Sequence, residues 1–210
     1  MFAPKFTQVT DRALLLEAMR EIPFAIVFGP IGASDVPPEQ VSATHLPLVV
    51  RDQGDHGVLE GHFATANPHW RALAGREALV VFPGPHSYVS PTLYSETLSV
   101  PTWNYIAIHA HGPVTLVQDD AGKLDLLHGL IEAHEPSFLD EWKQKPDGYK
   151  RTMLAGITGF RMPIARIEGK FKLSQNRALD ERRNVRAAHA AGSPDQQSLA
   201  RWMQRLVDLG

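Results

Sequence analysis

The 210-residue sequence contains no cysteine. This absence excludes disulfide scaffolds, thiolate zinc sites and thiol nucleophiles, and it fits the reducing conditions of the cytoplasm. Any redox chemistry must therefore come from a bound cofactor. The sequence also lacks a basic N-terminal region followed by an apolar run, and no stretch approaches the roughly 20 apolar residues that cross a bilayer. We therefore expect a cytoplasmic protein without a membrane partner.

A large excess of one charge is also lacking, because 21 Lys and Arg residues face 23 Asp and Glu residues. A net charge of -2 provides no general attraction to a phosphate backbone, so DNA binding would need a local basic patch. The GxSxG nucleophile motif is absent as well. His109 and His111 lie two apart on a predicted strand and could chelate a metal, but no HExxH motif accompanies the ten histidines. We predict no metal site.

The patterns that are present predict at least six strands with few helices between them. This favours an α+β fold built on an antiparallel β-barrel over a doubly wound α/β sheet. Turn residues are concentrated at 29–38. Strands are predicted at 24–28, 42–50, 58–63, 78–82, 105–117 and 156–173, and helices at about 11–22, 67–75, 121–134, 147–154, 180–191 and 194–206.

Residues 82–111 combine more rings and hydrogen-bonding groups than most other stretches. Prolines at 83–85 and 101 predict turns that hold the groups between them. Two interpretations stay open: a grip on a planar ligand with polar edges, or a packed loop whose Tyr and Trp residues satisfy their own polar ends. Trp103 and Tyr105 share one face of their strand by alternation. The candidates here are Tyr88, Ser90, Trp103, Asn104 and Tyr105.

Further candidates lie in three other stretches. Ser42 and Thr44 share one face of a predicted strand, and His45 points to the other face. These side chains either contact a ligand or form hydrogen bonds with backbone groups. His62 lies beside a turn, and Asn67 begins a helix whose amide groups could receive a phosphate. The third stretch is a basic, amide-rich turn suited to phosphate, or else a solvated strand-to-helix junction. Its residues are Lys170, Lys172, Ser174, Gln175, Asn176 and Arg177.

Six segments carry a resemblance to a known family. In their order along the chain, they resemble the signature blocks of the PaiB-type family, described as FMN-binding negative transcriptional regulators with the FMN-binding split-barrel fold. The resemblance extends over about residues 1–190. The segments are residues 43–48 (ATHLPL), 61–62 (GH) with 67–70 (NPHW), 84–90 (GPHSYVS), 100–105 (VPTWNY), 156–160 (GITGF) and 172–177 (KLSQNR).

The resemblance implies a homodimer of six-stranded split barrels, a fold shared with pyridoxamine-phosphate oxidase-like flavoproteins, with FMN at the dimer interface. We predict a split-barrel domain at residues 1–177 and a helical C-terminal extension of that domain at 178–210. Two alternatives stay open because a fold does not decide a function. One is a flavin-dependent oxidoreductase that acts on a small molecule, and the other is a haem-binding or haem-degrading protein.

The C-terminal helices bear on partners. Arg182, Arg183 and Arg186 could contact DNA, but neighbouring acidic residues dilute their charge and no helix-turn-helix is evident. We therefore expect repression to run through a protein partner or a small-molecule reaction. The last helix is expected to expose an apolar side to a second copy of the chain. Its apolar residues are Leu199, Trp202, Met203 and Leu206.

Overall fold

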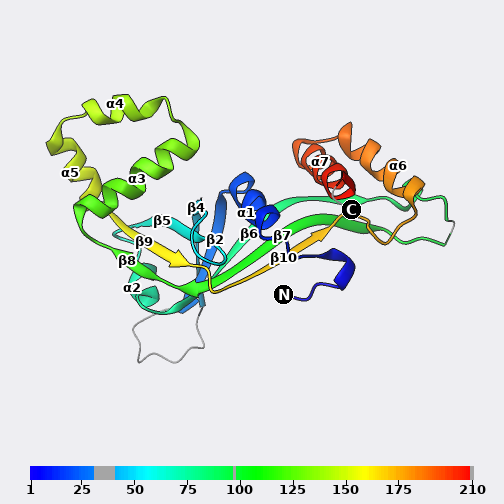
Figure 1. The fold of residues 1–210 in the computed structure, drawn as a ribbon, viewed down its shortest axis with the longest axis horizontal. Helices are drawn as coiled ribbons and strands as arrows, with labels where there is room; N and C mark the ends of the chain where they lie inside the picture. Colours follow the sequence, from blue (N-terminus) through cyan, green and yellow to red (C-terminus); the bar gives the residue numbers. More distant parts are fainter. Residues whose placement is uncertain (31–40, 97, 209–210) are drawn as a thin grey trace. The chain divides into compact units, whose positions relative to one another are not determined.

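The computed structural model describes residues 1–30, 41–96 and 98–208 (Figure 1). The chain folds into two compact units. Two long strands, β6 (Glu77–Val89) and β7 (Thr102–Pro113), contribute residues to both units. Most of the turn predicted at 29–38 lies outside the described residues. Unit 1 comprises Met1–Asp11, Pro83–Ile108 and Glu168–Gly210, and unit 2 comprises Arg12–Phe82 and His109–Ile167.

Unit 2 contains two groups of antiparallel strands. In the first group β2 pairs with β3 and with the N-terminal part of β6, and the second group has the order β4-β5-β9-β8. The single strand predicted at 42–50 is divided at Leu48, because Pro47 has no N–H and the Leu48 amide donates to the Pro23 carbonyl at 2.8 Å. The strands are β2 (Phe24–Pro30), β3 (Val41–Pro47), β4 (Val49–Arg51), β5 (Val58–Ala64), β8 (Thr115–Val117) and β9 (Ile157–Pro163).

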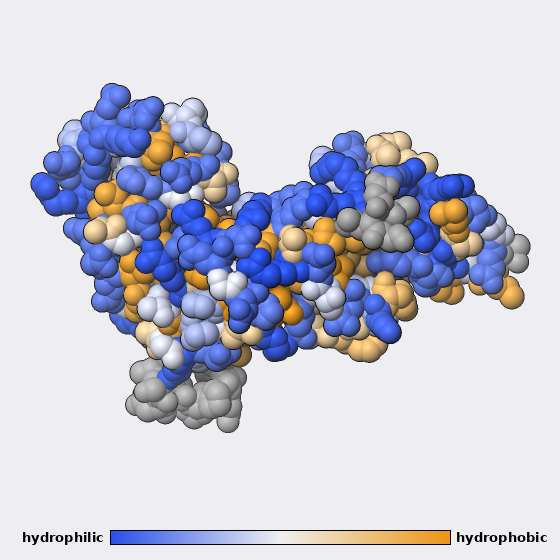
Figure 2. All heavy atoms as spheres, in the orientation of Figure 1, coloured by the Kyte–Doolittle hydropathy of each residue, from blue (hydrophilic) through white to orange (hydrophobic). Residues whose placement is uncertain are grey.

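The helices of unit 2 pack against these strands. Leu15, Leu16 and Met19 recur at helical spacing and are almost fully buried, so α1 covers part of the core. Helix α3 contacts α4, α5, β5 and β9. Hydrophilic residues cover most of α4 and its surroundings on the face shown in Figure 2. The helices are α1 (Arg12–Glu21), α2 (His69–Leu73), α3 (Asp120–His134), α4 (Phe138–Gln144) and α5 (Asp147–Ala155); among the described residues, none is long and apolar enough to span a membrane.

Unit 1 has the strand order β1-β10-β7-β6, and α6 and α7 lie side by side in it (Figure 1). A reciprocal capping box begins the last helix, since the Ser193 amide donates to Gln196 Oε1 at 2.8 Å and the Gln196 amide to Ser193 Oγ at 3.4 Å. The predicted division between residues 177 and 178 falls within this unit. The elements are η1 (Lys5–Thr7), β1 (Gln8–Val9), η2 (Pro91–Leu93), β10 (Arg166–Lys172), α6 (Leu179–Ala190) and α7 (Pro194–Asp208).

Two expectations about unit 1 are wrong. The last helix does not expose its apolar side: Leu199 and Met203 are buried, and the buried Trp202 ring meets Phe171 edge-on at 5.2 Å. The prolines at 83–85 form no turn, because β6 continues through them to Val89. The fixed φ of proline is compatible with an extended chain, and the registered pairing of β6 with β2 ends at Val81, so these prolines remove no donor from it.

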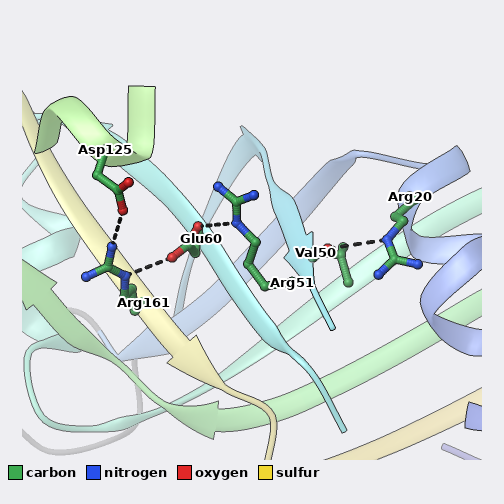
Figure 3. Close-up of polar contacts among 6 residues, drawn as sticks. All are labelled: Arg20, Val50, Arg51, Glu60, Asp125 and Arg161. Carbon is green, nitrogen blue, oxygen red and sulfur yellow. Dashed lines mark hydrogen bonds and ion pairs between the residues drawn. The ribbon is translucent and has the colours of Figure 1, made fainter. Parts of the chain in front are cut away.

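A buried carboxylate ties the second strand group of unit 2 together (Figure 3). Glu60 on β5 is 7% exposed, and Nε of Arg51 and Nε of Arg161 each donate to its carboxylate at 2.8 Å. Nη2 of Arg161 also donates to Asp125 on α3 at 2.8 Å. Gly129 leaves room for the first of these arginines, because a Cβ there would lie 2.1 Å from Arg51 Nη2. Four elements are thereby joined through one charged group.

Burial of Glu60 by itself would raise the pKa of its carboxyl group. The hydrogen bonds and charges of Arg161 and Arg51 outweigh that effect, so the pKa of Glu60 is lowered from its ordinary value of 4.5. A carboxyl group whose pKa is lower in the folded than in the unfolded state stabilises the fold fully above the unfolded value. This contribution is lost as the pH falls through the folded value.

Replacing Glu60 with glutamine is expected to lower the free energy of unfolding by roughly 1–3 kcal/mol at pH 7, since two guanidinium groups lose their charged acceptor. Urea denaturation of both proteins at pH 7 and at values below 4.5 measures this. The difference between them should shrink as the pH falls. A matched control is Glu141→Gln, which removes an exposed carboxylate bonded to Lys145 and should have no measurable effect. Equal stability of the Glu60 variant and the wild type would contradict the assignment.

Candidate functional site

Three side chains of unit 2 form a hydrogen-bonded group beside β2, which we name the Thr44 cluster: Thr44, Asn67 and His69. Nδ2 of Asn67 donates to Thr44 Oγ1 at 3.2 Å, and Nδ1 of His69 lies 2.8 Å from the same oxygen. The His69 amide donates to Asn67 Oδ1 at 3.0 Å and so orients that side chain. Because the threonine oxygen accepts from Asn67, its own hydrogen can be given to Nδ1, which assigns the proton of the imidazole to Nε2.

His69 is 4% exposed. Burial lowers the pKa of its imidazole. The neighbouring Gly29 backbone raises this pKa, but by less. Within the described residues, Nε2 makes no hydrogen bond of standard geometry. The backbone approaches closely here, since a Cβ on Gly29 would lie 2.1 Å from Leu73 Cδ2 and 3.3 Å from His69 Nε2. The cluster therefore holds a neutral histidine with one unsatisfied polar atom.

The strand β3 places the other candidates of its stretch as predicted. Ser42 and Thr44 are partly buried on one face, and His45 is exposed on the other. The His45 ring stacks on the exposed Phe24 ring at 6.0 Å. Ser42 is therefore on the same strand face as the cluster threonine, whereas His45 is directed away from it.

His62 is likewise not brought into the Thr44 cluster. Phe63, the next residue on β5, meets the His69 ring edge-on at 5.8 Å, so by alternation His62 points to the opposite face, together with Glu60. Its Nδ1 is buried without a hydrogen-bond partner among the described residues. Burial lowers the pKa of His62, which keeps its imidazole neutral at pH 7.

Unit 1 presents a group of exposed rings, which we name the aromatic surface: His86 and Tyr88 on β6 and Trp103 on β7. Tyr88 is 49% exposed and Trp103 is 52% exposed. The Trp103 ring lies 6.1 Å from Tyr88, edge-on, and 6.2 Å from His86. Tyr105 is partly buried and follows on the same face of β7, as predicted. Such rings offer a wide apolar contact to a planar molecule.

Lys172 is anchored next to the aromatic surface. Its ammonium group donates to Thr102 Oγ1 at 2.6 Å and to the Trp103 carbonyl at 2.5 Å. Burial lowers the pKa of Lys172, and the neighbouring charges of Lys170 and Arg177 lower it further. These positive charges oppose one another, so an anion placed among them would relieve the repulsion.

The rest of the turn uses its polar groups internally. Gln175 donates to the Phe171 carbonyl and accepts from the Leu173 amide at 2.7 Å. Ser174 is buried with a φ of 62° and donates to Asn104 Oδ1 at 3.1 Å. Nδ2 of Asn104 in turn lies 3.4 Å from His189 Nε2, and burial lowers the pKa of that histidine. Ser174 and Asn104 thus hold β7 and α6 together inside unit 1.

The remaining candidate side chains differ in whether other groups of the chain already bind them. Arg177 lies 3.5 Å from Glu96 and 3.9 Å from Glu181, and its guanidinium group is 3.9 Å from the centre of the Tyr94 ring. Ser90 caps η2 by accepting from the Thr92 amide at 3.2 Å. Asn176 is exposed. Lys170 donates to the Phe2 carbonyl at 3.1 Å and lies 5.3 Å from the Tyr105 ring centre.

Two residues of these groups were not among the candidates chosen from sequence. His69 was part of the NPHW motif, and a histidine directly after Asn-Pro at a helix start was a usable signal. His86 was part of the GPHSYVS motif. His86 and Tyr88 lie two apart on one strand and so share a face. The turn predicted at 83–85 conflicts with that strand. Both contacts depend on partners far along the chain.

Comparisons with known proteins identify the family of the chain. Residues 1–166 match the family described as "Putative FMN-binding domain". The chain is 34% identical over 188 residues to "Protease synthase and sporulation protein PAI 2" of Bacillus subtilis (strain 168), covering 88% of this chain and 87% of that protein. It is 29% identical over 212 residues to the uncharacterized protein AN0679 of Emericella nidulans, covering 82% of this chain and 84% of that protein.

Two solved structures are similar in fold. The flavocytochrome Anf3 of Azotobacter vinelandii has a TM-score of 0.57 and 17% identity, covering 79% of this chain and 69% of that chain. The conserved hypothetical protein Rv2991 of Mycobacterium tuberculosis has a TM-score of 0.58 and 11% identity, covering 84% and 92%. The predicted split-barrel class is confirmed. The chain therefore belongs to the PaiB-type family of FMN-binding split-barrel proteins, whose cofactor is FMN.

Proposed function

We propose that the chain binds FMN in unit 1, with the flavin ring on the aromatic surface and the phosphate at Lys172, and that it acts in gene regulation without binding DNA itself. The observation that carries the proposal is that the Lys172 ammonium group donates to the backbone carbonyl of Trp103, whose side chain is half exposed. FMN needs a cationic phosphate site, an apolar face for its ring and hydrogen-bonding groups along its edge. All three kinds of group are present around β7.

The electrostatics of Lys172 support the phosphate assignment. Two of its three ammonium hydrogens are committed to Thr102 and Trp103, which leaves the third for an incoming acceptor. Lys170 adds a second cation, whereas Arg177 is already paired with carboxylates. Asn176 is exposed at the same turn and offers an amide. The remaining candidates Gln175, Ser174 and Asn104 would then shape the turn rather than touch the ligand.

The Thr44 cluster is a second candidate set for flavin contacts, because it offers a hydroxyl, an amide and an unsatisfied imidazole nitrogen. It lies in unit 2 and is tested by its own variant. Ser42 shares its strand face, while His45 and His62 point elsewhere. Thr44 is the member whose side chain bonds directly to both of the others.

A second function has one observation in its favour. Bound FMN would supply electron- and hydride-transfer chemistry. The aromatic surface is about half exposed, which leaves room for a small substrate beside the flavin. This supports a flavin-dependent oxidoreductase acting on a small molecule, as an activity of its own or as the basis of regulation. A haem protein on the same fold is distinguished from both by its absorption spectrum.

We predict that Trp103→Ala and Lys172→Met each weaken FMN binding by about tenfold or more, because they remove ring stacking and a charged phosphate contact respectively. Quenching of flavin fluorescence during titration of the protein measures the affinity. Lys145→Met, at the residue directly after α4, is the matched control for the lysine change and should leave the affinity unchanged. Circular dichroism checks that each variant is folded.

Two results would contradict this assignment. If Thr44→Val abolishes binding while the two unit 1 variants bind normally, the Thr44 cluster is the flavin site instead. Protein purified from cells should show flavin bands in its absorption spectrum. A Soret band without flavin bands would favour the haem alternative.

We also propose a homodimer in the cytoplasm, as the family resemblance implies. The buried face of α7 does not support it, but unit 1 exposes other apolar side chains: Leu98 is 92% exposed and Val100 is 71% exposed. Together with Trp103 they form apolar surface that a second copy would cover. Light scattering at micromolar concentration should give twice the chain mass, and Val100→Glu should shift the mass towards the monomer. Met153→Glu in unit 2 is the control, and a monomeric wild type would disprove the proposal.

The regulatory part of the proposal predicts weak DNA binding. The three arginines of α6 line a cavity with apolar walls rather than a continuous basic face, and the net charge of the chain is -2. A mobility-shift assay at physiological salt should show no nanomolar binding to promoter or random DNA. A protein that contacts several phosphates would instead lose roughly 10³-fold or more in affinity between 50 and 200 mM salt. Nanomolar, sequence-selective binding by the protein alone would overturn the indirect route.

A further inference from the structure

A cavity of about 550 Å³ lies in unit 1 between α6, α7 and the end of β10. Its size falls in the range of small-molecule sites, which run from roughly 300 to 1,000 Å³. Leu173 and Met203 are buried in its wall, and Leu179, which is 51% exposed, lies at its edge. The surface around α6 and α7 shows hydrophobic and hydrophilic residues next to one another (Figure 2).

Three arginines of α6 also line this cavity: Arg182, Arg183 and Arg186. Arg182 and Arg186 are one helical turn apart and so lie on one face of the helix. None of their three guanidinium groups forms a hydrogen bond or ion pair in the part of the chain that the structure describes. Glu181 is the buried carboxylate next to these arginines in sequence. Its oxygens already accept hydrogen bonds from Ser95 and from the Glu96 amide, and it forms an ion pair with Arg177.

This pattern differs from that of other arginines of the chain. Arg51 and Arg161 share Glu60, and Arg177 is paired with Glu96 and Glu181. Three like charges next to a partly apolar cavity repel one another, and none of the described residues supplies a compensating partner. A bound anion would supply the missing charge. Guanidinium groups recognise planar or tetrahedral oxyanions through paired hydrogen bonds, so the head group should be a carboxylate or a phosphate.

The apolar walls specify the rest of the ligand. Leu173, Met203 and Leu206 would contact hydrocarbon or ring atoms and bury them from water. A free inorganic anion would leave these apolar walls uncovered. From the combination of cations and apolar side chains, we infer that this cavity is a second binding site, distinct from the FMN site, for a small amphipathic oxyanion: a carboxylate or phosphate on an apolar body.

Isothermal titration of the full-length protein with octanoate, below its micelle concentration, tests the site. Saturable binding is expected, with acetate and octanol each binding at least tenfold more weakly, because the first lacks the tail and the second lacks the charge. Phenyl phosphate in place of octanoate distinguishes the two head groups. Arg182→Gln and Arg186→Gln should each lower octanoate affinity about tenfold.

Arg201→Gln is the matched control, because Arg201 is exposed on the neighbouring helix α7 and does not line the cavity. It should leave octanoate affinity unchanged. Leu179→Ala tests the apolar part without touching charge and should weaken octanoate more than phenyl phosphate. The proposed site would be overturned if Arg182→Gln and Arg186→Gln bound octanoate as tightly as the wild type. Acetate binding as tight as octanoate binding would also overturn it. Displacement of octanoate by FMN at a one-to-one ratio would show that the cavity belongs to the flavin instead.

Discussion

The second strand group of unit 2 depends on the buried Glu60 carboxylate and its two guanidinium partners. Transferring a carboxylate into a protein interior costs several kcal/mol unless charged donors compensate for the lost water. That compensation requires Arg51 on β4 and Arg161 on β9 to meet Glu60 on β5, so the register of three strands is coupled to one ionisation state. Asp125 extends the coupling to α3. Gly129 contributes by having no side chain where Arg51 lies.

Polar groups of unit 1 also differ in whether the chain provides their partners. Those with partners support the structure, and those without can bind a ligand. Arg177 has two carboxylates and an aromatic ring, and the side chains of Ser174, Gln175 and Asn104 satisfy one another and the backbone. Lys172 keeps one free donor next to an exposed tryptophan. The guanidinium groups of the three arginines of α6 make no hydrogen bond to any of the described residues. A turn that looks uniformly basic and amide-rich in sequence is thus divided into supporting residues and residues that can receive an anion.

Family membership and geometry address different questions about function. Membership identifies the fold and FMN, but it carries no statement about which residues touch the flavin or what the flavoprotein does. The geometry contributes an ammonium group anchored on the backbone of a half-exposed tryptophan, which suits a flavin, and a separate, partly apolar cavity lined by three arginines, which suits an oxyanion. A regulator that responds to a small molecule and an enzyme that converts one would both use such an arrangement.

The sequence by itself determined the features that depend on short-range periodicity and capping. The shared face of Ser42 and Thr44, that of Trp103 and Tyr105, and the Ser193–Gln196 capping box all follow from residues a few positions apart. The antiparallel class followed from strands joined by short turns, and the family blocks added the cofactor. Only the tertiary structure decided which side chains meet across long separations. Thr44 meets His69, Lys172 meets Trp103, and the apolar side of α7 meets Phe171, because packing and the satisfaction of buried charges select partners that no local pattern encodes.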